Sequence, residues 1–356
     1  MKLLKRLTYL FISTLILFSC SSDDDIAIIT DPPGPLGDYE DGILITNEGP
    51  FGTGTGAISF LSNETEVIEN NIYQNVNNLE LGNIVQSMYL SNDLAYIVVN
   101  NSNKIVAVNR YTFEEVTRIE IGLNNPRFMT IENGKGYVTN WGDPFDDSDD
   151  FVAIIDLDAN TVSSTISVSF GPEKITNIDG KVYVAHKGGF SQNNIVTVID
   201  AASNSIITTI EVGDVPNSMV ISEGDLWILS EGNPSFTGNE TNGSLVKIDS
   251  GTNSVTQELN FELTQHPTNL TLEGTNLFYN LDGGIYTTDT ASTSLPTNSI
   301  IDGFFYSMTA NNGKLYATDA GDFASNGTLK IFDLVTNVEI QSIEVGIIPG
   351  GVYFNN

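Results

Sequence analysis

Short apolar runs separated by small polar residues recur along the chain. In two clear copies, runs rich in β-branched and aromatic residues alternate with clusters of Gly, Asn, Asp and Ser. The runs of the first copy are 126–129, 136–140, 152–156 and 165–168, and those of the second begin at 172, 181, 195 and 209. Runs of this kind, bounded by turn-forming residues, are typical of β-strands. Four runs in each copy predict one four-stranded antiparallel sheet per repeat.

The repeat varies in length but keeps its first strand. One apolar residue near the start of each repeat serves as a marker, and the markers are Met88, Met129, Ile175, Met219, Leu270, Met308 and Val352. Neighbouring markers lie between 38 residues apart (Leu270 to Met308) and 51 residues apart (Met219 to Leu270). A period of about 40–50 residues with four strands in each unit indicates a β-propeller. No long segment has the 3.6-residue apolar period of an amphipathic helix, which argues against a mixed α/β fold.

The first and last repeats complete each other. Val352 has no second strand after it, whereas the run 42–46 looks like a second strand with no first strand before it. The segment upstream of Gly42 is rich in Pro and Gly and is a poor strand, because proline donates no backbone hydrogen bond. We therefore predict an all-β fold: a seven-bladed β-propeller of residues 42–356 with four antiparallel strands per blade. The ring is closed by the C-terminal strand, 351–354, within the first blade, which removes exposed sheet edges.

A four-residue motif in the third repeat supports this architecture. Tyr137-Val138-Thr139-Asn140 resembles the signature of the YVTN family of seven-bladed propellers, and the similarity extends over roughly residues 42–356. The resemblance implies the propeller architecture. It implies little about activity, because propellers host many unrelated functions.

The N-terminus is predicted to be a lipoprotein signal peptide, residues 1–19. Three basic residues precede a 12-residue apolar segment, 7–18, which is too short to span a bilayer. The following Leu17-Phe18-Ser19-Cys20 resembles the bacterial lipobox, which implies that Cys20, the single cysteine of the chain, carries a lipid.

The residues after Cys20 predict where the anchored protein resides. The run 21–25, Ser-Ser-Asp-Asp-Asp, resembles the surface-export signal of Bacteroidetes lipoproteins, although a solvated acidic spacer would have the same composition. Residues 20–41 are predicted to be a lipid-anchored, acidic and Pro/Gly-rich linker. The resemblance implies an outer-membrane lipoprotein exposed at the cell surface.

The chain is strongly acidic, with a net charge of −31 at pH 7. A field of this sign repels phosphate backbones and excludes nucleic acid as a partner. Part of the acidity has a structural explanation, because one repeat position at the end of the third strand holds Asp or Asn in six repeats. These residues are Asn109, Asp156, Asp200, Asp249, Asp289 and Asp333. Their side chains are predicted to accept amide hydrogens of the hairpin turn that follows.

Loops that join second and third strands are the first candidates for a binding surface. Five of the seven carry an aromatic residue among Gly and polar residues; the aromatic residues are Phe51, Trp141, Phe145, Phe190, Phe236 and Phe323. A large aromatic side chain on an exposed loop lowers solubility unless it packs or binds something. Each ring taken alone has a plain alternative, which is to pack its own loop onto the blade below. Their recurrence on one face favours a binding role.

Polar residues at the starts of the inner strands are expected to surround the mouth of the central channel. They are Gln86, Arg127, Glu173 or Lys174, Asn217, Thr268 or Asn269, and Tyr306. An aromatic rim around converging polar groups suits a large amphipathic small molecule. The candidate ligand contacts are therefore Gln86, Arg127, Lys174, Asn217 and Tyr306, with His186 from an aromatic-bearing loop. The alternative for Arg127 is a salt bridge to a neighbouring acid such as Glu173.

The sequence offers little support for catalysis, so we predict a protein that is not an enzyme and has no cofactor. His186 and His266 are the two histidines, and neither has metal-ligand spacing around it. The acidic loop 143–150 departs from the EF-hand pattern, so a solvated loop is expected there and calcium binding stays open. No nucleophile–His–acid set and no Gly-rich phosphate loop is apparent in the spacing.

The combination of lipobox, acidic export run and YVTN-type ring resembles the corrinoid-binding propeller lipoproteins of the Bacteroidetes surface. The resemblance implies capture of a vitamin B12-type ligand and its delivery to a TonB-dependent outer-membrane transporter. One alternative is a glycan- or protein-binding surface module, in which the same aromatic rings stack on sugars. Another is a propeller lyase that uses His186 or His266 with a metal ion.

Overall fold

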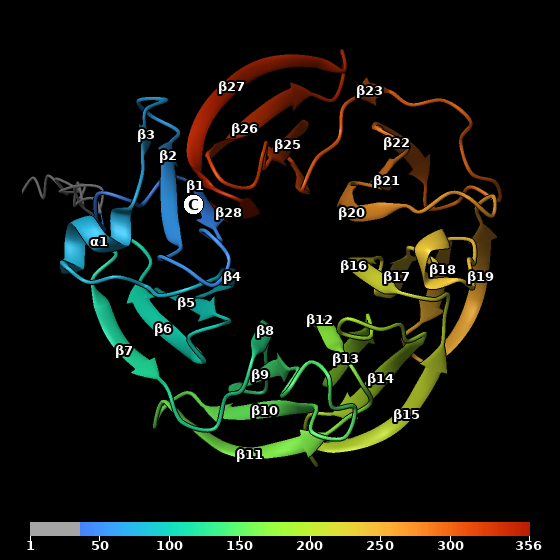
Figure 1. The fold of residues 1–356 in the computed structure, drawn as a ribbon, viewed down its shortest axis with the longest axis horizontal. Coiled ribbons are helices and arrows are strands. Elements are labelled where there is room, and N and C mark those ends of the chain that lie inside the picture. The colour runs from blue at the N-terminus through green and yellow to red at the C-terminus, as the bar shows by residue number, and fades with distance from the viewer. Residues whose placement is uncertain (1–35) are drawn as a thin grey trace, which may run out of the picture. The chain divides into compact units, whose positions relative to one another are not determined.

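The seven repeats form seven separate antiparallel sheets arranged as the blades of a β-propeller (Figure 1). The computed structural model describes residues 36–356. Each sheet has four strands, and the strand order within a blade follows the sequence in six of the seven blades. The predicted all-β fold with seven four-stranded blades is confirmed.

The strands occupy four equivalent positions, from the channel outward. The innermost strands are β4 (Val85–Ser91), β8 (Pro126–Glu132), β12 (Pro172–Ile178), β16 (Pro216–Ser222), β20 (Thr268–Glu273), β24 (Ser307–Asn311) and β28 (Pro349–Asn355). The second strands are β1 (Gly42–Asn47), β5 (Leu94–Val99), β9 (Lys135–Asn140), β13 (Lys181–His186), β17 (Asp225–Ser230), β21 (Asn276–Leu281) and β25 (Lys314–Asp319).

The outer half of each blade is less regular. The third strands are β2 (Ala57–Ser62), β6 (Lys104–Asn109), β10 (Phe151–Asp156), β14 (Ile195–Asp200), β18 (Ser244–Asp249), β22 (Gly284–Asp289) and β26 (Asn326–Asp333). The outer strands are β3 (Ile68–Glu69), β7 (Glu115–Ile119), β11 (Thr161–Ser167), β15 (Ser205–Glu211), β19 (Ser254–Asn260), β23 (Ile301–Asp302) and β27 (Val338–Ile347). Two of these, β3 and β23, are only two residues long.

The C-terminal strand closes the ring as predicted. β28 is the innermost strand of the first blade and pairs antiparallel with β1, so that Ile43 lies opposite Phe354 and Ile45 opposite Val352. In Figure 1 the red β28 lies beside the blue β1 in the same sheet. Because this pairing satisfies the backbone groups of β1, that strand is not left as an exposed edge, and the first blade has four strands like the others.

The hydrophobic core lies between the blades. Within residues 36–356, seven apolar clusters each combine side chains of two neighbouring blades. One cluster joins Tyr137 and Ile154 of the third blade to Val182 and Ile199 of the fourth. Each second strand is buried along nearly its whole length, because both of its faces pack against another sheet.

Polar residues of the repeat hold the turns together. In all six predicted positions, from Asn109 to Asp333, the side chain accepts an amide hydrogen of the following turn; in one example Asp333 Oδ1 accepts from the N–H groups of Val335 and Thr336. The prediction of a turn-forming role is confirmed. These contacts lower the pKa of Asp333, because the hydrogen bonds favour its charged form.

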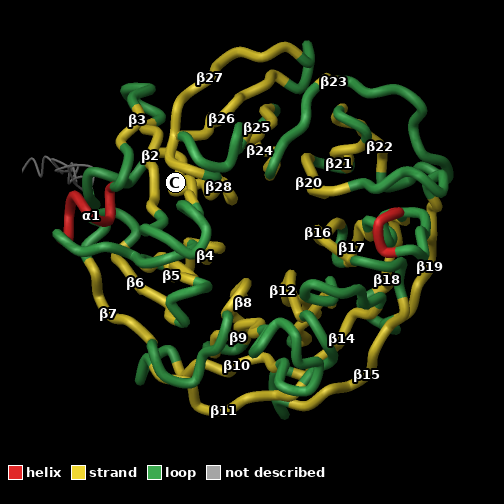
Figure 2. Tube along the Cα trace, in the orientation of Figure 1, coloured by secondary structure: helices red, strands yellow, loops and turns green. Residues whose placement is uncertain are grey.

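Helical structure in residues 36–356 is limited to the short helix α1 (Ile72–Asn77) and the 3₁₀ turn η1 (Ser235–Thr237), shown in red in Figure 2. Helix α1 covers the outer side of the first two blades, where Ile72 and Tyr73 join their shared core. None of the described helices has the length and apolar character needed to cross a membrane. The predicted signal peptide, Cys20 and most of the predicted linker lie outside the described residues.

Candidate ligand-binding site at the channel mouth

The starts of the inner strands are irregular, and this irregularity directs side chains toward the channel. The pairing of inner and second strands shifts by one residue at five places, where one or two inner-strand residues are skipped: between Val85 and Ser87, Pro126 and Met129, Pro172 and Ile175, Pro216 and Ser218, and Thr268 and Thr271. A β-bulge leaves the extra residues unpaired and changes the direction of their side chains. The skipped residues include Gln86, Arg127, Glu173, Lys174, Asn217 and Asn269.

A backbone bend precedes most of these inner strands. In five blades the residue just before the inner strand has a positive φ; these residues are Ile84, Asn125, Gly171, Val215 and Ile348. A β-branched residue in this region costs of order 1–3 kcal/mol. Compensating hydrogen bonds come from the second-to-third-strand loops, since the N–H of Glu48 donates to the carbonyl of Ile348 and that of Glu231 to the carbonyl of Val215. The two sets of loops therefore form one hydrogen-bonded rim.

A cavity of about 500 Å³ lies at this end of the channel. Most of its wall comes from two repeat positions: the bulges of the inner strands and the residues that directly follow second strands. From the bulges and strand starts come Gln86, Arg127, Phe128, Glu173, Lys174, Asn217, Thr268, Asn269, Tyr306 and Gly350, and from the second position come Glu48, Lys187 and Glu231. The wall thus carries three carboxylates and three basic side chains.

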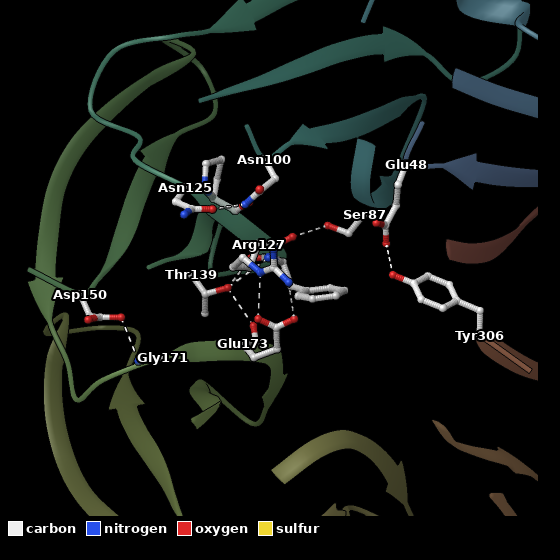
Figure 3. Close-up of polar contacts among 12 residues, drawn as sticks. Glu48, Ser87, Asn100, Asn125, Arg127, Thr139, Asp150, Gly171, Glu173 and Tyr306 are labelled. Atoms are coloured by element: carbon white, nitrogen blue, oxygen red, sulfur yellow. Dashed lines mark hydrogen bonds and ion pairs between the residues drawn. The ribbon is translucent and has the colours of Figure 1, made fainter. Parts of the chain in front are cut away.

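Arg127 and Glu173 form a bidentate ion pair across two blades (Figure 3). The guanidinium donates from Nε and a terminal nitrogen to the two Glu173 oxygens at 2.9 Å each. Thr139 positions the acid, because its hydroxyl donates to the Glu173 carbonyl oxygen at 2.8 Å. Burial opposes ionisation of Glu173, but the Arg127 charge outweighs it and holds the pKa of Glu173 below its ordinary value. This pair leaves neither charge free for a ligand.

The opposite wall carries a hydrogen-bonded acid. The Tyr306 hydroxyl donates to Glu48 Oε1 at 2.8 Å (Figure 3). Burial raises the pKa of Glu48, and the Tyr306 hydrogen bond and the Arg127 charge reduce that shift without cancelling it. Burial and the neighbouring Glu48 charge also raise the pKa of Tyr306, so its hydroxyl stays protonated and acts as a donor.

Two lysines face the cavity without an acidic partner. No carboxylate in residues 36–356 lies within 4.0 Å of Lys174 Nζ or Lys187 Nζ. Lys174 Nζ instead lies 3.7 Å from the centre of the Phe128 ring. Burial lowers the pKa of Lys174 to about 8, despite the opposing effect of Glu173.

Sequence comparison gives this fold a family. The sequence model described as "Domain of unknown function (DUF5074)" matches residues 41–342. The chain belongs to the DUF5074 family. No curated protein matches it.

Solved structures similar to this DUF5074 chain share its architecture. A functionally unknown protein from Desulfotomaculum acetoxidans superimposes with a TM-score of 0.65 at 12% identity, over 88% of this chain and 98% of its own. Hydrazine synthase from Kuenenia stuttgartiensis gives 0.57 at 16% identity, over 86% and 97%. The dihydro-heme d1 dehydrogenase NirN gives 0.52 at 10% identity, over 92% and 78%. At these identities the likeness shows the fold alone.

The structure brings together the polar residues selected from the sequence. Gln86, Arg127, Lys174, Asn217 and Tyr306 of this DUF5074 chain all line the one cavity. Their availability differs. Arg127 forms the predicted alternative, the salt bridge to Glu173, and Asn217 donates to the carbonyl of Pro267 at 3.0 Å. Lys174 has no such partner.

The aromatic residues selected from the loops fall into two groups. More than half of the surface of each of five is exposed; these are Phe51, Phe145, Phe190, Phe236 and Phe323. Trp141 is instead buried, with the Arg127 guanidinium carbon 4.0 Å from its ring centre. Phe190 contacts both Trp141 and Phe145, at centroid distances of 5.9 and 5.5 Å. Trp141 therefore packs within the protein, against the Arg127 guanidinium. This is the packing alternative stated above for a single aromatic ring.

His186 lies away from the cavity. The side chain is fully buried, its Nδ1 lies 3.3 Å from the carbonyl oxygen of Phe170, and its Nε2 lies 2.8 Å from the Thr197 hydroxyl. Burial lowers the pKa of His186 to about 4, so the ring is neutral at pH 7. This placement corrects the expectation of a ligand contact, because both ring nitrogens already have protein partners.

Three charged residues of the cavity were missed by the sequence reasoning. Glu48, Lys187 and Glu231 each follow a second strand directly, at one equivalent repeat position. Burial raises the pKa of Glu231, and the Lys187 charge reduces that shift. Aligning the repeats on the last residue of the second strand would have placed all three on the same ring as Trp141.

The acidic loop 143–150 uses several of its carboxylates to accept backbone N–H groups. Asp149 accepts the N–H of Asp143, Asp146 accepts that of Ser148, and Asp150 accepts that of Gly171. Among residues 36–356 no group of three or more His, Cys, Asp or Glu side chains is arranged to hold a metal ion.

Proposed function

We propose that the protein binds a small molecule at the mouth of its channel, and that the ligand is a bulky solute with a negatively charged or strongly polar group. The supporting observation is the pair Lys174 and Lys187, two cavity lysines that have no carboxylate within 4.0 Å among residues 36–356, in a chain with a net charge of −31. A partly buried charge without a partner is unfavourable. An anionic ligand group would satisfy both.

The shape of the site supports a ligand larger than the cavity. A volume of about 500 Å³ lies within the roughly 300–1,000 Å³ typical of small-molecule pockets. The exposed rings of Phe145, Phe190 and Phe236 belong to the loops of the surrounding rim. A polar group of the ligand would enter the cavity while its apolar body rests on the rim.

A corrinoid is our preferred candidate ligand, since its large macrocycle would rest on the rim and a projecting polar group would reach the lysines. We further propose that the protein acts as a lipoprotein, anchored through Cys20 to the outer membrane and exposed at the cell surface. There it would pass the ligand to a TonB-dependent transporter. Both proposals depend on the resemblance of residues 17–25 to lipoprotein export signals.

Calorimetry with cyanocobalamin tests the proposal, and Gly350→Leu provides a blocked site. A Cβ at Gly350 would meet its nearest atoms, Glu48 Oε1 and Thr46 Oγ1, at 3.5 Å, which is an ordinary contact. The leucine side chain should therefore fill the cavity without disturbing the fold. We expect heat and a raised melting temperature with the wild type, and neither with Gly350→Leu.

Lysine variants separate a specific site from general attraction. Lys187→Met should weaken binding at least tenfold, whereas Lys314→Met, which removes an exposed lysine outside the cavity, should leave it unchanged. If no heat and no thermal shift appear with micromolar cyanocobalamin, the corrinoid is excluded. Equal loss of binding in both lysine variants would contradict the cavity as the binding site.

A glycan is the second candidate, because the cavity wall is rich in amide and carboxylate groups that suit sugar hydroxyls, among them Gln86, Asn217 and Asn269. Since Trp141 is buried, stacking would fall to the exposed phenylalanines. Retention on polysaccharide beads that is lost in Phe145→Ala, with no response to cyanocobalamin, would favour this candidate.

A further inference from the structure

Lys174 differs from the paired lysines of the chain in its surroundings. Lys181 donates to Ser250 and Asn253, and Lys247 and Lys330 pair with Asp225 and Asp319. In residues 36–356, Lys174 Nζ has neither a hydrogen-bond acceptor nor a carboxylate within contact distance, although it lines a solvent-connected cavity. Its nitrogen is therefore both accessible to a small solute and poorly stabilised as a cation.

The neighbouring groups make the neutral amine accessible near neutral pH. Burial lowers the pKa of Lys174 to about 8, and the positive charges of Arg127 and Lys187 act in the same direction. The Phe128 ring favours the cation. A lysine next to other cationic groups is an arrangement that activates an amine as a nucleophile.

We infer that Lys174 captures carbonyl compounds reversibly, as an imine, and that the preferred partner is a small aldehyde bearing a carboxylate or phosphate. The inference uses the cavity of the proposed function but requires no bulky ligand. Lys187 provides the second contact, because it lines the same cavity without a carboxylate within 4.0 Å among the described residues.

The chemical step is balanced by groups in the cavity. Lys174 first loses a proton to solvent, and its lone pair then adds to the carbonyl carbon to give a carbinolamine. In this adduct one proton first moves from nitrogen to oxygen, which gives the neutral carbinolamine. The oxygen then gains a second proton, the C–O bond breaks to release water as the nitrogen lone pair forms the C=N bond, and the nitrogen loses its last proton to leave the imine. Glu48 is suited to move these protons, because it lines the same cavity and burial raises its pKa above the ordinary value.

Reductive trapping with matched aldehydes tests the inference. The full chain is incubated with 4-carboxybenzaldehyde or with benzaldehyde, and cyanoborohydride reduces any imine to a stable amine. Peptide mass spectrometry then locates the modification. We expect one equivalent on Lys174, formed at least tenfold faster than on the exposed Lys314, and faster with the carboxylate-bearing aldehyde than with benzaldehyde.

Two further comparisons distinguish reaction at this site from the general reactivity of lysine side chains with aldehydes. Lys104 is an internal control, because burial also lowers its pKa but it lies outside the cavity. It should not discriminate between the two aldehydes. In Lys187→Met both reactions at Lys174 should slow as its pKa rises, but their ratio should fall to about one. Modification of Lys174 no faster than of Lys314, or an unchanged ratio in Lys187→Met, would overturn the inference.

Failure of this inference can be told apart from failure of the proposed function. Heat with cyanocobalamin but no covalent label would remove only the imine. A label on Lys174 that Gly350→Leu abolishes, in a protein without a cyanocobalamin response, would remove only the bulky-ligand proposal.

Discussion

Replacing Asp150 with asparagine tests how the acidic loop of the third blade is held to the channel rim. Asp150 is 1% exposed, and its Oδ1 accepts the N–H of Gly171 at 2.9 Å (Figure 3). Its Oδ2 is buried and has no hydrogen-bond partner. Gly171 directly precedes β12, which carries Glu173 and Lys174, so this bond links the loop 143–150 to the cavity wall.

The expected magnitude follows from the cost of ionising this group. Burial raises the pKa of Asp150 from 3.8 to about 7, and the charges of Asp149, Asp147 and Asp146 add to the shift. Between these values the folded protein binds the proton more tightly than the unfolded chain does. The stabilising contribution is therefore complete below pH 3.8 and is lost as pH rises through about 7. At about 1.4 kcal/mol per pKa unit, the loss is at most about 4 kcal/mol.

Chemical denaturation of the wild type and Asp150→Asn at pH 4.5, 6 and 8 measures this loss. The neutral amide imitates the protonated carboxyl, so the variant should gain stability relative to the wild type by about 1.4 kcal/mol per pH unit up to about pH 7. Asp147→Asn, which removes an exposed carboxylate from the same loop but keeps Asp150, is the control. It should lose stability with rising pH as the wild type does, over a slightly shorter range, because one of the charges that raise the pKa of Asp150 is gone. Parallel stability curves for the wild type and Asp150→Asn across this range would refute the reasoning.

Four further outcomes are expected. Arg127→Met and Glu173→Gln should each destabilise the fold by about 3 kcal/mol or more, while the double variant recovers most of the loss; a denaturation cycle measures the coupling, and additive losses would contradict it. Deleting 349–356 should expose the inner edge of β1 and abolish cooperative unfolding, which calorimetry and gel filtration would detect. The affinity for an anionic ligand should fall as pH rises through about 8, because Lys174 loses its charge there, and calorimetry of Lys174→Met should show no such fall. The association rate of an anionic ligand should rise with added salt, because salt screens the repulsion from the net charge of −31; stopped-flow fluorescence would show the trend.

The fold could be predicted because each structural requirement recurs in the sequence. A second strand packs against sheets on both faces, so each copy must be apolar along its length, as in the run around Tyr137. The turn residues from Asn109 to Asp333 also recur because of a shared structural requirement. In each of these blades the third strand is followed by a similar hairpin turn. Ring closure through Val352 could be predicted by counting strands. The first repeat lacks its first strand, and the last repeat, which contains Val352, consists of a first strand alone.

The site could be predicted only in part, because its geometry depends on features that leave no clear sequence signal. The β-bulges direct Arg127 and Lys174 toward the channel. A bulge is recognised from the pairing register of the inner and second strands, which the sequence pattern does not show. The burial of Trp141 depends on the Arg127 guanidinium that covers it, which belongs to another strand. The sequence pattern placed Trp141 on the correct loop, but it did not show that the Arg127 guanidinium already covers the indole ring.

The residues that follow the second strands support the proposal of a ligand site at the channel mouth. A structural position in a repeat faces the same demand in every blade, as the six Asp and Asn turn residues do. Three residues that directly follow second strands line one cavity, yet they differ in charge: Glu48, Lys187 and Glu231. The same position in the other four blades holds Asn100, Trp141, Asp282 and Ala320, which differ in size and polarity. Seven near-equivalent blades would present a symmetric mouth if packing alone determined these residues. Their diversity makes the mouth asymmetric, which is what recognition of a single asymmetric small molecule requires.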